Sequence, residues 1–223
     1  MISIYTMRQL RSIIILTMLT ALVKLFGCSG QTKKSGLSKE MKEQLAQSVD
    51  AFKNRSIHAT LTAQIIDTTS DDNLLQVVFD NLSAKLSSNP ENENEYETVM
   101  TWNKSRQAIY MIWLLEAEVN NGGYNQFYFN SSGQFYKHLP EALKLVRALK
   151  FSALTEQANS TYEKKNEKIT KHRDETLEGF SKSDEDNPLN EYDDKFYELY
   201  QEENLQKIQV EYIRKHKDEF VDK

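Results

Sequence analysis

Residues 108–115 read Ala-Ile-Tyr-Met-Ile-Trp-Leu-Leu, a stretch that is apolar on every side of a helix. Such a stretch predicts a helix over residues 103–121 that other elements surround, because a helix on a surface keeps one polar face. The helix is expected to end at Asn121-Gly122-Gly123, since a glycine readily takes the left-handed conformation that closes a helix. One buried helix is therefore the expected centre of the domain.

Helical patterns also precede this segment. Ser70-Asp71-Asp72 places a cap and acidic side chains before an apolar run, which predicts a helix to residue 86. Residues 57–67 fit a helix or a strand, and their context favours a helix. Further upstream, apolar residues recur every three or four positions after Ser38, as in an amphipathic helix. This stripe consists of Leu37, Met41, Leu45, Val49 and Phe52.

The rest of the chain continues the helical pattern. Helices are expected over residues 137–149, 152–168, 171–180, 193–200 and 203–217. No segment shows the sustained alternation of a strand, so the predicted fold class is all-α, a compact multi-helix domain. Pro90 and the absence of apolar residues mark Ser87–Glu95 as a loop. This loop is expected to separate an N-terminal helical segment, residues 37–90, from the main domain, residues 91–223.

Composition excludes several classes of protein. Seven Gly and three Pro are too few for a collagen-like or low-complexity chain, and 10% aromatic residues argue against wholesale disorder. A single cysteine leaves no intramolecular disulfide and no cysteine-based zinc or iron–sulfur site. Because 33 acidic residues outnumber 28 basic ones, no direct binding of nucleic acid is expected, since that would normally need a basic face.

Residues 1–27 are typical of a bacterial lipoprotein signal peptide. Arg8 and Arg11 give a positive start, and Ser12–Val23 follows as an apolar stretch too short for a bilayer span, which needs about 20 apolar residues. Leu25-Phe26-Gly27-Cys28 then resembles a lipobox, with a small residue before the cut and Cys28 as the thiol that takes the lipid. The alternative is an ordinary cysteine in an uncleaved anchor helix.

Cleavage before Cys28 would leave residues 28–36 as a lipidated tether, because Ser29–Gly36 contains no apolar residue. Two or three acyl chains hold a protein stably on a membrane. The expected location is therefore the bacterial cell envelope, with a lipid anchor as the contact with the membrane. Ser29 stands where some lipoproteins carry the aspartate that retains them in the inner membrane, which favours the outer membrane.

The segment at residues 115–133 points to a family. It combines a helix end, a double glycine, an aromatic-rich stretch with a glutamine, and an Asn-Ser-Ser-Gly loop. In these features it resembles the core of the bacterial DNA-mimic-protein family, whose C-terminal domain is also known as a domain of unknown function. The similarity covers about residues 100–220. The motif residues singled out are Glu116, Glu118, Asn120, Asn121, Gly122, Gly123, Gln126, Asn130, Ser131, Ser132 and Gly133.

The resemblance implies an all-helical domain without known catalytic residues. It also implies an acidic surface, since at least one member of the family copies the charge of DNA and occupies a transcription factor. An exported lipoprotein would not meet a transcription factor, so DNA mimicry is not carried over to this chain. A basic protein of the envelope is the partner expected instead.

The motif has two interpretations that need no family. In the first, its polar side chains satisfy one another and the backbone groups freed where the central helix ends, which fixes a helix corner. In the second, Glu116, Asn120, Gln126 and Asn130 line a pocket for a small ligand or peptide, and the protein is a binding protein or a hydrolase. We favour the first, because buried polar groups normally pair with one another. The second predicts a concave pocket that contains a carboxyl group of perturbed pKa.

The most acidic part of the chain is Asp184–Glu203, with nine acidic residues and Lys195 as its one cation. Negative charge at this density attracts cationic surfaces. A solvated loop around Pro188 is the alternative, since charge runs are usually exposed segments. The residues expected to form the acidic partner-binding face are Asp184, Glu185, Asp186, Glu191, Asp193, Asp194 and Glu198.

No catalytic or metal-binding pattern stands out. The four histidines are far apart in sequence, and the His-x-x-Glu pairs that begin at His172 and His216 lack a third ligand. Ser131 and Ser132 have no identifiable histidine partner. The sequence therefore predicts no enzyme, no cofactor and no metal. It predicts a non-catalytic, membrane-anchored protein that binds a protein partner.

Overall fold

The computed structural model describes residues 38–87, 94–172, 176–185 and 187–222. The predicted signal peptide, Cys28 and the tether lie outside these residues. The chain divides into two compact units, Met1–Ser56 and Ile57–Lys223. Every regular element among the described residues is helical, so the all-α prediction is confirmed.

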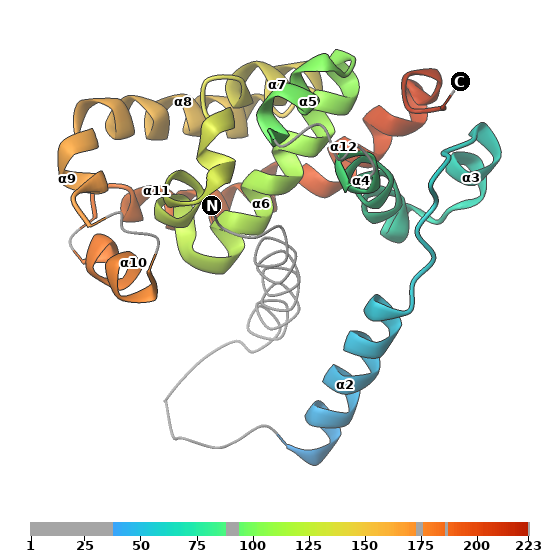
Figure 1. The fold of residues 1–223 in the computed structure, drawn as a ribbon, viewed down its shortest axis with the longest axis horizontal. Coiled ribbons are helices and arrows are strands. Elements are labelled where there is room, and N and C mark those ends of the chain that lie inside the picture. Colours follow the sequence, from blue (N-terminus) through green and yellow to red (C-terminus); the bar gives the residue numbers. More distant parts are fainter. Residues whose placement is uncertain (1–37, 88–93, 173–175, 186, 223) are drawn as a thin grey trace. The chain divides into compact units, whose positions relative to one another are not determined.

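The first unit contains one described helix, α2 (Lys39–Lys53), which begins directly after Ser38 as predicted. Near its end, the guanidinium of Arg55 lies 3.6 Å from the centre of the Phe52 ring. The second unit holds the remaining elements (Figure 1). These are α3 (Ala63–Thr68), α4 (Asp71–Ser87), α5 (Glu95–Thr101), α6 (Lys104–Phe129), η1 (Ser131–Phe135), α7 (Leu139–Leu145), α8 (Leu149–Lys164), α9 (Asn166–Thr170), α10 (Leu177–Asp184), α11 (Asn190–Glu202), α12 (Leu205–Lys215) and η2 (Lys217–Glu219).

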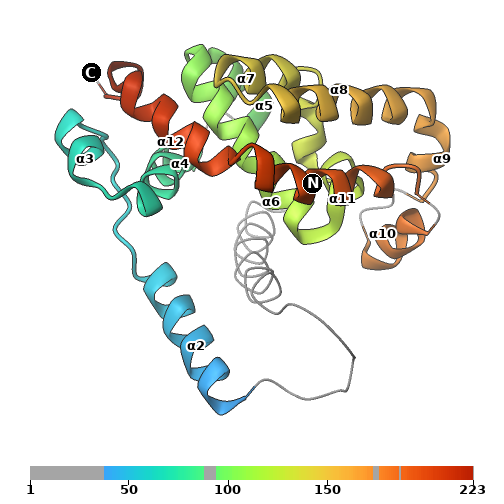
Figure 2. The same cartoon turned by 180° about the vertical axis from the view of Figure 1, so that it is seen from behind.

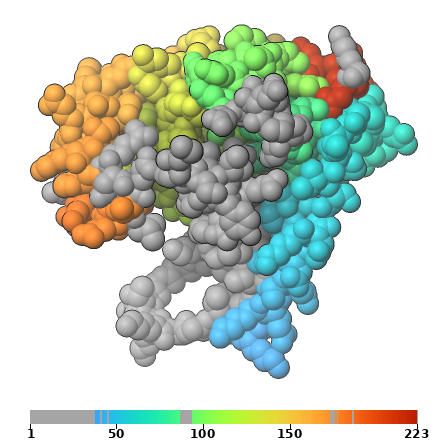
Figure 3. Space-filling model, viewed as in Figure 1, coloured from blue at the N-terminus to red at the C-terminus, as the bar shows by residue number. Residues whose placement is uncertain are grey.

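Helix α6 is the centre of this unit, as its sequence predicted. Its residues 108–113 are all buried, and α4, α7, α10, α11 and η1 all contact it. Helices α11 and α12 follow one another across the side of α6 that Figure 2 shows. In the space-filling view of Figure 3, the residues of α8 to α10 gather at one end of the unit, while the C-terminal residues lie beside α3 and α4 at the other.

The double glycine bends α6 without ending it. Gly122 has φ −157° and Gly123 has φ 74°, both outside the helical region. Gly123 has the positive φ that favours glycine, but its ψ is −178° and the helix resumes at Tyr124 and runs to Phe129, so the predicted end of the helix at residues 121–123 is wrong. The second part of α6 can turn back toward residues of the first part because of this kink.

Helix α5 was not predicted, since the sequence pattern placed a loop up to residue 95 and no element between that loop and the helix expected from residue 103. The Asn94 side chain caps α5 by accepting the backbone N–H groups of Tyr96 and Glu97. Thr98 and Val99 are buried, which attaches this short helix to the domain. The predicted division after residue 90 stays a prediction, although α4 packs against both α6 and α12 within the unit Ile57–Lys223.

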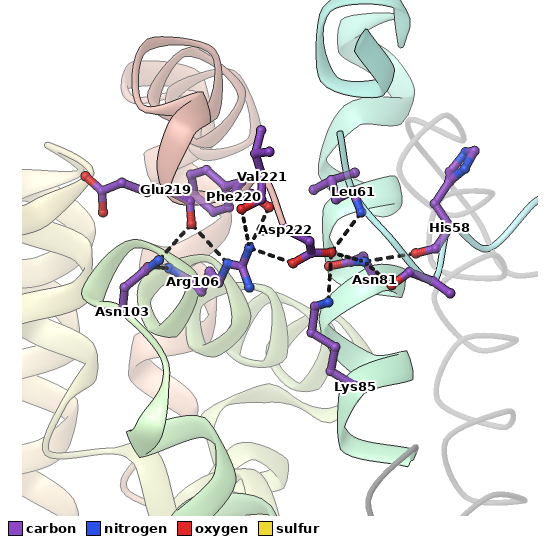
Figure 4. A network of polar contacts seen from close by, with 11 residues as sticks. His58, Leu61, Asn81, Lys85, Asn103, Arg106, Glu219, Phe220, Val221 and Asp222 are labelled. Atoms are coloured by element: carbon purple, nitrogen blue, oxygen red, sulfur yellow. Dashed lines mark hydrogen bonds and ion pairs between the residues drawn. The ribbon is translucent and has the colours of Figure 1, made fainter. Parts of the chain in front are cut away.

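The end of the described chain is held by a cluster of polar contacts, shown in Figure 4, which we call the C-terminal clasp. The Asp222 carboxylate accepts hydrogen bonds from the Leu61 backbone N–H (2.8 Å) and from Asn81 Nδ2 (3.3 Å). It also forms ion pairs of 2.8 Å with both Lys85 and Arg106. Arg106 donates further to the Phe220 carbonyl, so the clasp joins α4, the start of α6 and the last described residues.

Candidate functional site

Polar side chains of the motif meet around Glu118, and we call Glu118, Asn121, Gln126, Asn130 and Ser132 the polar corner. The Glu118 side chain is buried on the first part of α6, and Oε2 accepts hydrogen bonds from Gln126 Nε2 (2.6 Å) and Asn130 Nδ2 (2.8 Å). Ser132, which lies in η1, donates its hydroxyl to Glu118 Oε1 at a distance of 3.0 Å. Asn121 Nδ2 donates to Gln126 Oε1 at 2.8 Å and orients that amide. The corner thus satisfies its own polar groups, the arrangement expected of a structural lock.

Burial raises the pKa of Glu118, and the hydrogen bonds from Gln126, Asn130 and Ser132 oppose this effect only in part. The corner can also accommodate the protonated form. The Ser132 hydroxyl lies 3.0 Å from Glu118 Oε1 and 3.2 Å from the Phe127 carbonyl oxygen. A protonated Glu118 could donate to Ser132, which would then donate to Phe127, and every group would keep a partner.

Glu116 belongs to a different cluster. Tyr200 on α11 donates its hydroxyl to Glu116 Oε1, and Gln209 Nε2 on α12 donates to Oε2 at 2.7 Å. Burial raises the pKa of Glu116, with both hydrogen bonds acting in the opposite direction. Asn120 hydrogen-bonds the Tyr200 hydroxyl. The four residues expected to line one pocket therefore belong to two clusters. Glu116 and Asn120 bind side chains of α11 and α12, whereas Gln126 and Asn130 bind Glu118.

The kink in α6 is occupied by an aspartate from α11. Asp193 Oδ1 accepts the backbone N–H of Tyr124 at 2.8 Å and so caps the second part of α6. A Cβ at Gly123 would lie 2.2 Å from Asp193 Oδ2, so only glycine leaves room for this carboxylate. Burial, with further contributions from Asp184 and Asp194, raises the pKa of Asp193 to about 6.

Gly133 and Ser131, which also belong to the motif, lie in η1. A Cβ at Gly133 would lie 2.9 Å from the Tyr128 carbonyl oxygen, so this glycine allows η1 to approach the end of α6 closely. Ser131 is exposed at the start of η1. Neither position brings a second reactive group to the corner.

The predicted acidic face divides into exposed and inward-pointing residues. Asp184, Glu185, Glu191, Asp194 and Glu198 are exposed, and Asp186 lies outside the described residues. Asp193 instead turns inward to cap α6. Sequence reasoning also missed Tyr200 and Gln209, because neither the spacing nor the type of these residues indicates that they would meet Glu116.

Among the described residues, no group of three or more His, Cys, Asp or Glu side chains is arranged to hold a metal ion. Within the same residues, no helix is both long enough and apolar enough to cross a membrane.

Comparison with protein families identifies the class of this domain. The family model described as DMP19-like protein matches residues 100–216, which is more than half of the 223-residue chain. The chain belongs to the DMP19-like protein family. The matched region begins just before α6 and ends after α12, so it contains the polar corner, the kink and the acidic helix α11. No curated protein and no solved structure matches the chain.

Proposed function

We propose that this chain is a non-catalytic, lipid-anchored protein of the bacterial cell envelope that binds a basic protein partner through the exposed acidic side of α11. The observation that carries the proposal is the distribution of carboxylates on this helix. Glu191, Asp194, Glu198 and Glu202 are exposed and follow one another at spacings of three, four and four residues. Such spacings place them along one face of the helix, which we call the acidic stripe.

Two members of the acidic stripe are available to a partner. Glu191 pairs with Lys195 at 3.1 Å, and Glu202 pairs with Lys150 at 2.5 Å. Asp194 and Glu198 pair with no cation among the described residues. Unneutralised carboxylates that line one face of a helix attract a cationic surface and orient it during association.

The two buried glutamates of the motif, Glu116 and Glu118, support a non-catalytic role. Both oxygens of Glu116 and both oxygens of Glu118 already accept hydrogen bonds from side chains of the domain. A carboxylate that acts on a substrate needs an oxygen within reach of the reacting group. The raised pKa values of the two glutamates suit the alternative of a hydrolase or small-molecule binding protein. Burial and internal hydrogen bonds are nevertheless a sufficient cause of these shifts.

The location is proposed from the sequence alone. Arg8, Arg11, the apolar Ser12–Val23 and Cys28 have the order of a lipoprotein signal. The test is incorporation of labelled palmitate into the native chain and into Cys28→Ser, followed by separation of the membranes. Label that depends on Cys28 is expected. An unlabelled protein in the cytosol would overturn the anchor and make a transcription factor the partner to test.

The binding surface is tested by reversing charge on the acidic stripe and, as a control, on another exposed surface. Asp194→Lys with Glu198→Lys alters the acidic stripe, while Glu211→Lys with Asp218→Lys makes the same change in net charge on exposed residues of α12 and η2. The lipidated variants would be used to capture proteins from the envelope fraction at low and high salt. We expect one basic protein to be captured by the native chain and the control, but not by the stripe variant.

Salt dependence provides the second criterion. Exposed charges are screened beyond about 10 Å at 0.1 M salt and beyond about 3 Å at 1 M, so capture should fall steeply as salt rises. Equal capture by the stripe variant and its control, or capture that salt does not affect, would contradict binding through α11.

A further inference from the structure

The contact between Asp193 and the kink of α6 joins two elements that are otherwise far apart in sequence. The carboxyl group enters the space that the missing side chain of Gly123 leaves open, and it binds the first free N–H group of the second part of α6. Tyr192 and Phe196 flank it on α11 and are buried. The position of α11 on α6 therefore depends in part on one carboxyl group that lies in a restricted space.

The charged and titratable groups around Asp193 favour its neutral form. Asp184 on α10 and Asp194 on α11 both add negative charge. Burial raises the pKa of Tyr124 on α6 and of Tyr197 on α11, and the negative charge of Asp193 adds to both shifts, so neither phenol carries a charge near pH 7. The Tyr124 N–H group opposes these effects by stabilising the ionised carboxylate. Burial and two like charges outweigh this single hydrogen bond, since the pKa of Asp193 is raised to about 6.

We propose that the Asp193 carboxyl group is a proton-sensitive latch, which holds the first turn of α11 in the kink of α6 more firmly when it is protonated than when it is ionised. A protonated carboxyl group keeps the carbonyl oxygen that accepts the Tyr124 N–H and is not repelled by Asp184 and Asp194. An ionised Asp193 carboxylate keeps the hydrogen bond, but Asp184 and Asp194 repel its charge inside a half-buried site.

The latch lies on the same helix as the acidic stripe. Its consequence for partner binding rests on the proposed function, because a looser first turn would change how Glu191 and Asp194 are presented. The latch itself needs no partner and can be measured in the isolated full chain. A failure of the latch and a failure of the proposed function are therefore distinguishable.

The measurement is hydrogen–deuterium exchange of the full chain at pH 5.0 and pH 7.5, corrected for the intrinsic effect of pH. The Tyr124 amide reports the latch directly, because its N–H is the group that Asp193 binds. We expect local opening at Tyr124 and in the first turn of α11 to be on the order of tenfold more frequent at pH 7.5. The isosteric Asp193→Asn should remove this difference.

Asp194→Asn serves as the matched variant. It removes one repelling charge and leaves Asp193 in place, so the pH dependence should remain with its midpoint at lower pH. The titration of the Asp193 carboxyl carbon, followed by NMR in the native chain, gives a reading that needs no variant. A midpoint below pH 5, or a pH dependence of Tyr124 exchange that Asp193→Asn leaves intact, would overturn the latch.

Discussion

Asp222 and Leu61 bind one another twice across 161 positions of sequence: Asp222 Oδ2 accepts the Leu61 N–H at 2.8 Å, and the Asp222 N–H donates to the Leu61 carbonyl oxygen at 2.8 Å. Both residues lie outside the region that matches the family, residues 100–216. The C-terminal clasp thus attaches the flanking segments to the start of α6 through Arg106.

Asp222→Ala should lower the free energy of unfolding by about 3 kcal/mol, because it leaves Lys85 and Arg106 half-buried without their shared carboxylate. Urea unfolding measures this loss. Asp218→Ala is the control, since Asp218 is exposed and should cost less than about 0.5 kcal/mol. Equal effects of the two substitutions would show that the clasp contributes little.

Gln126→Ala tests the polar corner as a lock. The substitution removes one of the donors to Glu118 and leaves Asn121 without its acceptor, so we expect a loss of about 1–3 kcal/mol of stability. The exposed Gln134→Ala, in η1, controls for the loss of an amide. Unchanged stability of Gln126→Ala, together with the loss of a bound ligand, would favour the pocket over the lock.

Gly123→Ala should destabilise the domain by more than about 2 kcal/mol, because the left-handed backbone and the contact with Asp193 both oppose a Cβ there. The double variant with Asp193→Ala separates the two causes. Removal of the carboxylate should recover part of the loss, which gives a coupling energy of about 1 kcal/mol or more. Strict additivity of the two substitutions would mean that Asp193 does not occupy the kink.

Stability should rise as the pH falls from 7.5 to 5.5. Burial raises the pKa of Asp193 to about 6 and also raises the pKa values of Glu116 and Glu118, so the folded state binds more protons than the unfolded state in this range. The stabilisation is fully present below the ordinary pKa of 4.5 and is lost as the pH rises through the folded-state pKa. Urea unfolding at both pH values is the measurement, and Glu118→Gln should reduce the difference.

Asp222 changes the stability in the opposite direction, because its pKa is lowered in the folded state. Burial alone would raise its pKa, but hydrogen bonds from Leu61, Lys85 and Arg106 lower it below the ordinary 3.8. Its contribution is therefore present above pH 3.8 and is lost only as the pH falls through the lower folded-state value. A native chain that is more stable at pH 7.5 than at pH 5.5 would contradict the raised pKa values of Glu116, Glu118 and Asp193.

Arg147→Gly should stabilise the chain by about 1 kcal/mol. Arg147 has φ 72° at the end of α7, where the Ala148 N–H binds the Leu143 carbonyl and the Arg147 N–H binds that of Lys144. This is the hydrogen-bond pattern of a Schellman motif, whose left-handed position favours glycine. Thermal unfolding of Arg147→Gly, with Arg147→Ala as the control that keeps a Cβ, measures the effect. No gain for glycine over alanine would show that the position is unstrained.

Local patterns predicted the parts of the fold that depend on neighbouring residues. The uninterrupted apolar stretch at residues 108–115 indicated the buried centre, and the double glycine indicated the left-handed residue that bends α6. Glu118, Gln126 and Asn130 all stand in the motif and meet because they lie within thirteen positions of one another on α6 and its C-cap. The set expected to line one pocket, Glu116, Asn120, Gln126 and Asn130, instead divides between two clusters.

Contacts over long sequence separations could not be predicted in this way. Tyr200 and Gln209 meet Glu116 from 84 and 93 positions away, and no spacing rule connects them. The inward turn of Asp193 was hidden for the same reason, since in sequence it resembles its exposed neighbour Asp194. The C-terminal clasp depends on where helices meet, which single-chain periodicity does not specify.

The pairing of Leu61 with Asp222 also determines when the domain can be completed. Chains are made from the N-terminus, and segments that fold early wait for partners that are made later. The segment before α3 has its hydrogen-bonding partner among the last described residues, so this connection cannot form until residue 222 has been synthesised. The C-terminal clasp therefore forms only after the helices that it joins have been made, so it closes the domain and does not start its folding.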